Sequence, residues 1–228
     1  MNFLKAKDYQ KHAKIQNLMA LKLCLKLKHF KQKHFKKVFE FGCGRGEFTQ
    51  KLEKIISFDE YLKNDILDYG IDLKVQIFDM NKLAMHHLSK EKFDLIASNA
   101  TLQWLDLEHI LPTLFNMLNQ EGILLLSTFG KQNLKEIKQS TGFSLKYFNI
   151  YTLRQIFKKY FSNVKITEEI ISLDFNNALE VFKHLKLSGV NSLGFYRLNK
   201  QFLQDYEKKF QNKLTYHPIY ILCQKDMP

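Results

Sequence analysis

Short apolar runs alternate with amphipathic stretches along the first 130 residues of the chain. The apolar runs predict strands at residues 38–41, 54–59, 74–79, 93–99 and 122–129. The amphipathic stretches predict helices at residues 7–27, 46–54, 60–69 and 106–119. Strands that alternate with helices are typical of a parallel sheet covered on both faces, so the pattern predicts an α/β fold.

The remainder of the chain has a less regular pattern. It predicts helices at residues 152–161, 174–187 and 199–210, and strands at residues 163–173 and 217–224. Residues 131–149 are polar and irregular. No repeat or low-complexity linker divides the 228 residues, so we expect one domain that spans residues 1–228.

Charge is concentrated at the N-terminus. The net charge is +12, and residues 1–37 contain eleven lysines and one acidic residue, Asp8. Such a segment attracts an acidic protein, a nucleic acid or an anionic membrane surface, or its lysines simply solvate the faces of helices. We therefore expect residues 1–34 to form a basic helical segment that serves as a lid or as a surface for a partner.

Composition also indicates the compartment. Three cysteines, Cys24, Cys43 and Cys223, are far apart and odd in number, which favours free thiols in a reducing compartment. No apolar run reaches the roughly 18 residues that would span a bilayer, and the first residues do not resemble a signal peptide. We expect a cytoplasmic protein with no membrane segment and no metal site.

Glycines at alternate positions follow the first predicted strand. Gly42, Gly44 and Gly46 require a tight turn and leave no side chains over it, so a ligand can lie against the backbone. The Gly-x-Gly-x-x-Gly pattern of dinucleotide-binding proteins would need a third glycine at position 47, which is Glu47. The spacing Glu-x-Gly-x-Gly-x-Gly from Glu40 instead resembles motif I of the class I S-adenosylmethionine-dependent methyltransferases.

This resemblance implies a Rossmann-like fold with a mostly parallel, seven-stranded sheet, helices on both faces and extra helices as a lid. It also implies a cofactor, S-adenosylmethionine, at the strand ends. An acid after the second strand can accept from the ribose hydroxyls, and one after the third can accept from the adenine amino group. We predict Asp59 for the ribose, with Glu60 as the alternative, and Asp79 for the adenine. The full set of predicted cofactor-binding residues is Glu40, Gly42, Cys43, Gly44, Gly46, Asp59, Glu60, Asp79, Met80 and Asn99.

A narrower resemblance lies in the fourth strand and its loop. The run from Ser98 to Trp104, Ser-Asn-Ala-Thr-Leu-Gln-Trp, resembles the malonyl-acyl-carrier-protein O-methyltransferases that begin pimeloyl synthesis for biotin. Residues 9–16, 175–189 and 214–217 resemble other parts of the same family. The resemblance implies methylation of the free carboxylate of a malonyl thioester on acyl carrier protein. That carboxylate is ionised at neutral pH, so no general base is required.

Polar residues near the expected acyl site are candidates to position the substrate: Tyr9, His12, Gln103, Tyr216 and His217. Each of them is also compatible with ordinary packing. Because acyl carrier protein is acidic, the lysine-rich segment is predicted to bind it. Two other functions stay open at this point, a small-molecule carboxyl methyltransferase and a non-catalytic nucleic-acid-binding protein. Methylation of nucleic-acid bases is disfavoured, since neither an Asp/Asn-Pro-Pro-aromatic motif nor a Pro-Cys pair occurs.

Overall fold

The structure is a computed structural model that describes residues 13–28, 30, 32–70, 74–188 and 198–227. Seven strands form the main sheet, in the spatial order β3-β2-β1-β4-β5-β9-β6. Their bounds are β1 His34–Phe41, β2 Ser57–Asp65, β3 Val75–Ile77, β4 Phe93–Ser98, β5 Leu118–Phe129, β6 Asn163–Glu168 and β9 Pro218–Gln224. Only β9 runs antiparallel to its neighbours within this sheet. The predicted fold class is therefore confirmed.

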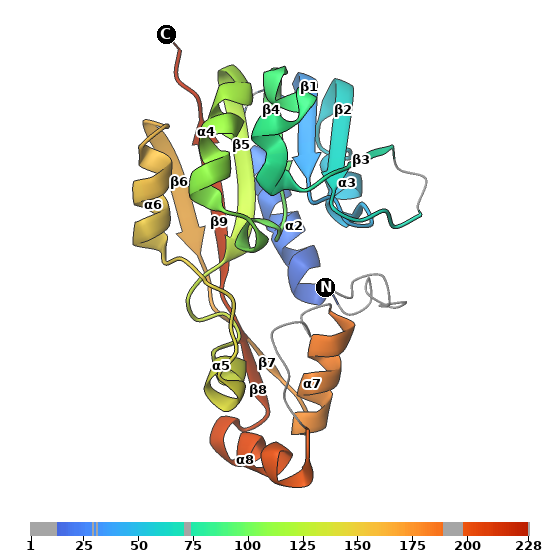
Figure 1. Ribbon diagram of the computed structural model, residues 1–228, viewed down its shortest axis with the longest axis vertical. Coiled ribbons are helices and arrows are strands. Elements are labelled where there is room, and N and C mark those ends of the chain that lie inside the picture. Colours follow the sequence, from blue (N-terminus) through green and yellow to red (C-terminus); the bar gives the residue numbers. More distant parts are fainter. Residues whose placement is uncertain (1–12, 29, 31, 71–73, 189–197, 228) are drawn as a thin grey trace.

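Helices cover both faces of the sheet (Figure 1). They are α2 Lys14–Lys28, α3 Glu47–Leu52, α4 Leu107–Met117 and α6 Ile150–Lys158, with 3₁₀ turns η2 Met80–Met85, η3 His87–Lys90 and η4 Leu102–Trp104. Successive residues of β5 point to opposite faces of the sheet. Ile123 and Leu125 pack with α2 and α3, whereas Leu124 and Leu126 pack with α4 and α6. A strand buried on both sides reads as a continuous apolar run, as β5 does.

Strand β2 corrects two predicted elements. The sequence predicted a strand at residues 54–59 and a helix at residues 60–69, but β2 continues to Asp65. It pairs in parallel with the whole of β1, from His34 opposite Ser57 to Phe41 opposite Asn64. The first half of this strand is polar because it is exposed and its charges are matched by charges on β1. The pattern of polar residues there was wrongly interpreted as a helix.

A smaller lobe lies beyond the carboxyl ends of the parallel strands (Figure 1). It comprises α5 Lys135–Thr141, β7 Ile171–Asp174, α7 Ala178–Leu187, α8 Lys200–Phe210 and β8 Lys213–Tyr216. Strands β7 and β8 form an antiparallel pair. The predicted strand at 163–173 is thus two strands, and the segment predicted to be irregular at 131–149 contains α5. Buried residues of α7, α8 and β8 belong to the same core cluster as those of α2, so the lobe is packed onto the sheet.

Side-chain caps fix where most of the larger helices begin. Asp106, Asn149, Asn177 and Asn199 each accept a hydrogen bond from a backbone N–H in the first turn of α4, α6, α7 and α8. Such a cap satisfies a donor that the helix itself leaves unpaired. None of the described helices is both long enough and apolar enough to cross a membrane.

Candidate functional site

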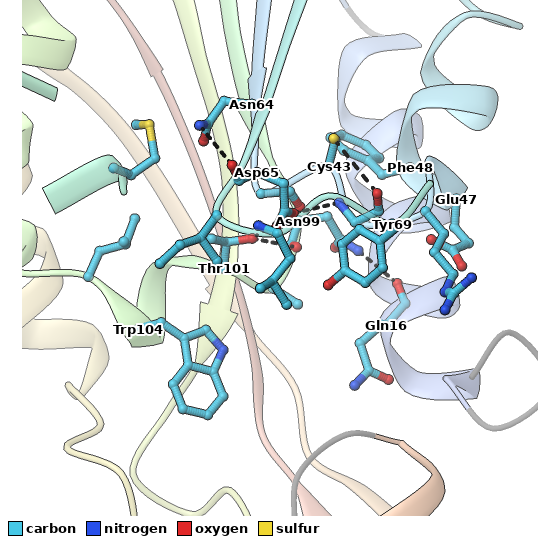
Figure 2. Close-up of a pocket in the computed structure, with 18 of the residues that line it drawn as sticks. Gln16, Cys43, Glu47, Phe48, Asn64, Asp65, Tyr69, Asn99, Thr101 and Trp104 are labelled. Atoms are coloured by element: carbon cyan, nitrogen blue, oxygen red, sulfur yellow. Dashed lines mark hydrogen bonds between the residues drawn. The ribbon is translucent and has the colours of Figure 1, made fainter. Parts of the chain in front are cut away.

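A cavity of about 250 Å³ lies at the carboxyl ends of β1, β2, β3 and β4 (Figure 2). The strand order reverses between β1 and β4, and ligands of open α/β sheets bind at such a switch point. Its lining comes from α2, the glycine turn, the segments after β2 and β3, and the loop after β4. The polar lining residues are Gln16, Asn17, Arg45, Glu47, Asn64, Asp65, Tyr69, Asp79, Asn81, Asn99, Thr101 and Trp104.

The glycine turn after β1 forms the floor of this cavity. Gly42 has a φ of 66°, and a Cβ placed there would lie 2.1 Å from the Thr101 hydroxyl oxygen. Gly44 has a φ of 57°, but a Cβ there would meet only the Glu47 carboxylate, at 4.0 Å. Gly42 is therefore required by the loop that packs on it, whereas Gly44 leaves open space over the backbone. Gly46 caps α3 and does not line the cavity.

Asp65 is the acid that β2 brings to the cavity. Its carboxylate accepts hydrogen bonds from the backbone N–H of Gly44, at 2.8 Å, and of Leu67, at 3.1 Å. Burial raises the pKa of this carboxyl, and the backbone donors oppose that rise. Because an ionised carboxylate has about four lone-pair positions, Asp65 can accept further bonds from a ligand.

Asp59 and Glu60 do not reach the cavity. Both are exposed near the start of β2, where Asp59 lies 3.3 Å from His34 and Glu60 lies 2.7 Å from Lys37. The prediction placed the end of β2 six residues too early. A signal for Asp65 is present in the sequence, since it follows Gly44 by 21 residues and the acid of dinucleotide-binding folds follows its glycines by about 20.

Residues after β3 form the next wall. Asp79 caps η2 by accepting from the backbone N–H of Asn81, at 3.0 Å, and its carboxylate lines the cavity. Met80 is buried against the same cavity. Phe78 also lines it and stacks on His86, with ring centroids 3.8 Å apart. This end of the cavity thus offers a flat apolar surface beside one carboxylate.

Asn99 joins the β4 loop to α2. Its side-chain amide donates to the Gln16 carbonyl oxygen, at 3.0 Å, and its side-chain oxygen accepts from the Ser127 hydroxyl, at 2.8 Å. Ser127 in turn accepts from the backbone N–H of Ala100, whose φ is 54°. Asn99 lines the cavity, where its place at the end of the fourth strand predicted it. Its described hydrogen bonds hold the loop after β4 against α2.

Glu40 faces the protein interior instead of the cavity. One of its carboxylate oxygens accepts hydrogen bonds from Thr49, at 2.7 Å, and from Tyr61, at 2.5 Å. Burial raises the pKa of Glu40 to about 7, against these two donors. Glu40 therefore supports the turn from below. Cys43 does line the cavity, and burial raises the pKa of its thiol, so it is a poor nucleophile at neutral pH.

A second cavity of about 60 Å³ adjoins the first. Gln16, Ala100 and Trp104 line both, and Trp104 and Gln16 lie along the lower edge of the site in Figure 2. The other lining residues come from η4, the end of β5, the segments around α5, the end of α7 and the end of β8. They are Gln103, Phe129, Asn133, Leu134, Leu145, Tyr147, Ser188 and Tyr216.

The residues predicted to position the substrate differ in whether they line the second cavity. Gln103 and Tyr216 line the second cavity. The His217 ring accepts from the backbone N–H of Gln132 and bonds to Glu168, at 2.8 Å, so its imidazole is used within the fold. The prediction of His217 as a substrate ligand is therefore not supported by its position. Tyr9 and His12 lie outside the described residues.

Comparison with known proteins identifies the family. A family model of a methyltransferase domain matches residues 9–164. The chain is 34% identical over 241 residues to a malonyl-[acyl-carrier protein] O-methyltransferase from Calditerrivibrio nitroreducens, covering 99% of this chain and 95% of that protein. It is also 34% identical to a protein of the same name from Haemophilus influenzae, over 95% and 89% of the two chains. The chain belongs to the class I S-adenosylmethionine-dependent methyltransferases.

Solved structures agree on the fold. An S-adenosylmethionine-dependent methyltransferase from Archaeoglobus fulgidus superposes with a TM-score of 0.57, over 92% of this chain and 94% of the other. The two sequences are 18% identical, so the likeness shows the fold alone.

The first cavity of the methyltransferase fits S-adenosylmethionine. The open space over Gly44 leaves room for a ligand against the backbone, and the carboxylate of Asp65 lies at its edge. The Asp65 carboxylate can accept from the ribose hydroxyls of such a ligand, and Asp79 with Phe78 and Met80 can hold its adenine. A ligand without phosphates needs no cluster of basic side chains, and Arg45 alone among the described lining residues carries a positive charge. Within the described part of the chain, no group of acidic, histidine and cysteine side chains is arranged to hold a metal ion.

Proposed function

We propose that this methyltransferase methylates the free carboxylate of a malonyl group carried by acyl carrier protein. The observation that carries the proposal is the chemistry of the second cavity. Its described lining residues include no Asp, Glu, His, Lys or Arg. A hydroxyl or ammonium acceptor would need a base to remove its proton, whereas a carboxylate is already ionised at neutral pH. The cavity therefore suits an acceptor that is anionic before it binds.

The relatives support the same acceptor. Two proteins that match nearly the full chain at 34% identity are named malonyl-[acyl-carrier protein] O-methyltransferase. The sequence run that resembles this family, from Ser98 to Trp104, forms the boundary between the two cavities. Ala100 and Trp104 line both of them, and Gln103 lines the second.

The residues of the chain act by positioning and by excluding water. Bound adenosylmethionine would supply a methyl group on a positively charged sulfur. Holding the acceptor oxygen beside that group replaces a bimolecular encounter, and such positioning can contribute about 7 to 11 kcal/mol. Trp104 lines both cavities and Phe129 lines the second, so apolar surface surrounds the place where the two charges would meet. Low local polarity strengthens their attraction.

An acidic carrier protein fits part of the basic surface. Several lysines are engaged within the chain: Lys22 with Glu169, Lys26 with Thr167, Lys33 with the Leu27 carbonyl oxygen, and Lys37 with Glu60 and Glu91. By contrast, Lys14, Lys28 and Lys36 are exposed, and no ion pair is described for them in the part of the chain that the structure covers. Lys14 begins α2 two residues before Gln16, which lines both cavities, whereas Lys28 ends α2 and Lys36 lies near the amino end of β1. We assign the carrier-binding role to Lys14.

Mass spectrometry of the carrier tests the proposal. Purified protein with adenosylmethionine should add about 14 Da to malonyl-carrier and nothing to acetyl-carrier, which lacks the free carboxylate. Malonyl-coenzyme A, tested in parallel, should be methylated more slowly because it lacks the carrier's acidic surface. Equal rates with coenzyme A would indicate a small-molecule methyltransferase, and no mass gain on malonyl-carrier would overturn the proposal.

A further inference from the structure

The second cavity contains one hydroxyl whose proton is not committed to another described group. Tyr147 lies between α5 and α6, and its oxygen accepts a hydrogen bond from the side-chain amide of Asn133, at 3.0 Å. Because this oxygen already accepts from Asn133, its own proton points elsewhere. Among the described residues, no acceptor for that proton is found.

Asn133 has a fixed orientation. Its side-chain oxygen accepts from the backbone N–H of His217, at 3.3 Å, so its amide nitrogen must face Tyr147. The backbone N–H of Asn133 is bonded to the Gly130 carbonyl oxygen, at 2.9 Å, and the side chain is buried. Gly130 is required here, since a Cβ would lie 2.6 Å from the His217 ring. The direction of the Tyr147 hydroxyl is therefore set by a rigid turn.

Three other polar side chains of the second cavity form hydrogen bonds within the fold, whereas none is described for the side-chain amide of Gln16, which lies at the boundary with the first cavity. Gln103 donates to the Ala100 carbonyl oxygen, at 2.6 Å, and Tyr216 bonds to His184, at 2.9 Å. Ser188 donates to the Leu185 carbonyl oxygen, at 3.2 Å. Burial raises the pKa of Tyr147, so its hydroxyl stays protonated at neutral and mildly alkaline pH.

We propose that Tyr147 binds the substrate by donating a hydrogen bond to the free carboxylate of the acyl group, and that Asn133 positions it. This inference rests on the proposed function and names the residue that distinguishes a malonyl from an acetyl group. A neutral donor suits the task, because it holds the carboxylate without forming an ion pair that would weaken the nucleophile. Hydrogen bonds to charged groups are stronger than neutral ones, so a single donor can give substantial discrimination.

The test compares Tyr147→Phe with Tyr151→Phe, the same change at a side chain that is 76% exposed on α6. Tyr147→Phe should raise the KM for malonyl-carrier about 10- to 100-fold. Inhibition by acetyl-carrier, which has no carboxylate, should not change. Binding of adenosylmethionine should match that of Tyr151→Phe, whereas the unfolding midpoint should be lower, because the buried Asn133 amide loses its acceptor. A purely structural role would instead weaken malonyl- and acetyl-carrier alike.

Asn133→Asp provides a second variant. One carboxylate oxygen of the new side chain can still accept from His217, while the other accepts the Tyr147 proton and turns it away from the cavity. The KM for malonyl-carrier should rise at least as much as in Tyr147→Phe, again with acetyl-carrier unaffected.

The outcomes separate this inference from the proposed function. If the wild-type protein methylates malonyl-carrier and Tyr147→Phe has an unchanged KM, the inference is wrong and the function stands. If the wild-type protein transfers no methyl group to malonyl-carrier, both are wrong.

Discussion

The two adjoining cavities of this methyltransferase are built in different ways. The first is formed at the ends of parallel strands, and its floor is backbone, held by a left-handed glycine turn and one buried carboxylate. The second is formed by side chains from segments that are far apart in the chain, including β5, the flanks of α5, α7 and β8. We propose that the carboxyl ends of the strands supply the cofactor site and that the second cavity supplies acceptor specificity. Substitutions should therefore affect one function without the other.

The largest effect is expected at Gly42. Gly42→Ala places a Cβ 2.1 Å from the Thr101 hydroxyl oxygen and keeps a φ of 66°, so the turn must shift. We expect roughly 2–4 kcal/mol of lost stability and no measurable cofactor binding. Thermal unfolding and calorimetric titration with adenosylmethionine measure the two quantities.

Gly44→Ala is the matched control for that change. It has a similar positive φ but no neighbour nearer than 4.0 Å, so only about 1–2 kcal/mol of backbone strain is expected. Cofactor affinity should still fall, because the methyl group would fill space over the turn. If Gly42→Ala proved no more destabilising than Gly44→Ala, the packing of Thr101 on the turn would not be what requires glycine.

Asp65 is expected to have the next largest effect. Asp65→Asn removes the charge beside the ribose position and should weaken adenosylmethionine binding by about 10- to 100-fold. Asp59→Asn should change it by less than about twofold, since Asp59 is exposed and pairs with His34. Calorimetry on both variants decides between the two acids. Loss of affinity in Asp59→Asn alone would restore the assignment made from the sequence.

Glu40 should make the stability of the folded protein depend on pH. Its pKa rises from 4.5 to about 7 in the folded protein, so the folded state holds the proton more tightly than the unfolded state. This group therefore favours folding most below about pH 4.5, and its contribution falls as the pH rises to about 7, beyond which it is constant. The change amounts to about 3 kcal/mol.

Glu40→Gln should remove that dependence. Thr49 and Tyr61 donate to the same carboxylate oxygen, so the amide oxygen of glutamine can accept both bonds. The unfolding free energies of the two proteins are compared from pH 5 to 8. Relative to the wild type, the variant should become more stable as the pH rises, by up to about 3 kcal/mol. A constant difference would mean that Glu40 is ionised throughout. A loss of cofactor affinity as large as that of Asp65→Asn would make Glu40 a cofactor ligand after all.

Surface lysines should have the smallest effect. Charge reversal of Lys14 should raise the KM for malonyl-carrier by about two- to threefold at low salt and less at high salt, whereas reversal of Lys28 and Lys36 should leave it unchanged. Adenosylmethionine affinity should not change. Reversal of Lys37 should instead lower the unfolding midpoint, because Lys37 pairs with Glu60 and Glu91. An unchanged KM in the Lys14 variant at low salt would exclude Lys14 from the carrier site.

The sequence predicted the parts of the site that depend on local pattern. The glycine turn, Asp79 and the loop after β4 are short, and their composition alone indicates a strand end. Asp65 was missed because the polar start of β2 is stabilised by pairing with β1, which local pattern does not contain. The division of residues 163–173 into β6 and β7 was missed for a similar reason. Strand pairing stops at Glu169 and Ile170, and the partner strand is also interrupted at His217.

Adenosylmethionine titration combined with carrier kinetics tests the division between the two cavities most directly. Three proteins are compared: wild type, Asp65→Asn and Tyr147→Phe. We predict that Asp65→Asn loses cofactor affinity and keeps its KM for malonyl-carrier at saturating cofactor. Tyr147→Phe should keep cofactor affinity and show a raised KM for malonyl-carrier. If either variant altered both quantities by similar factors, the two cavities would act as one site and the account would be wrong.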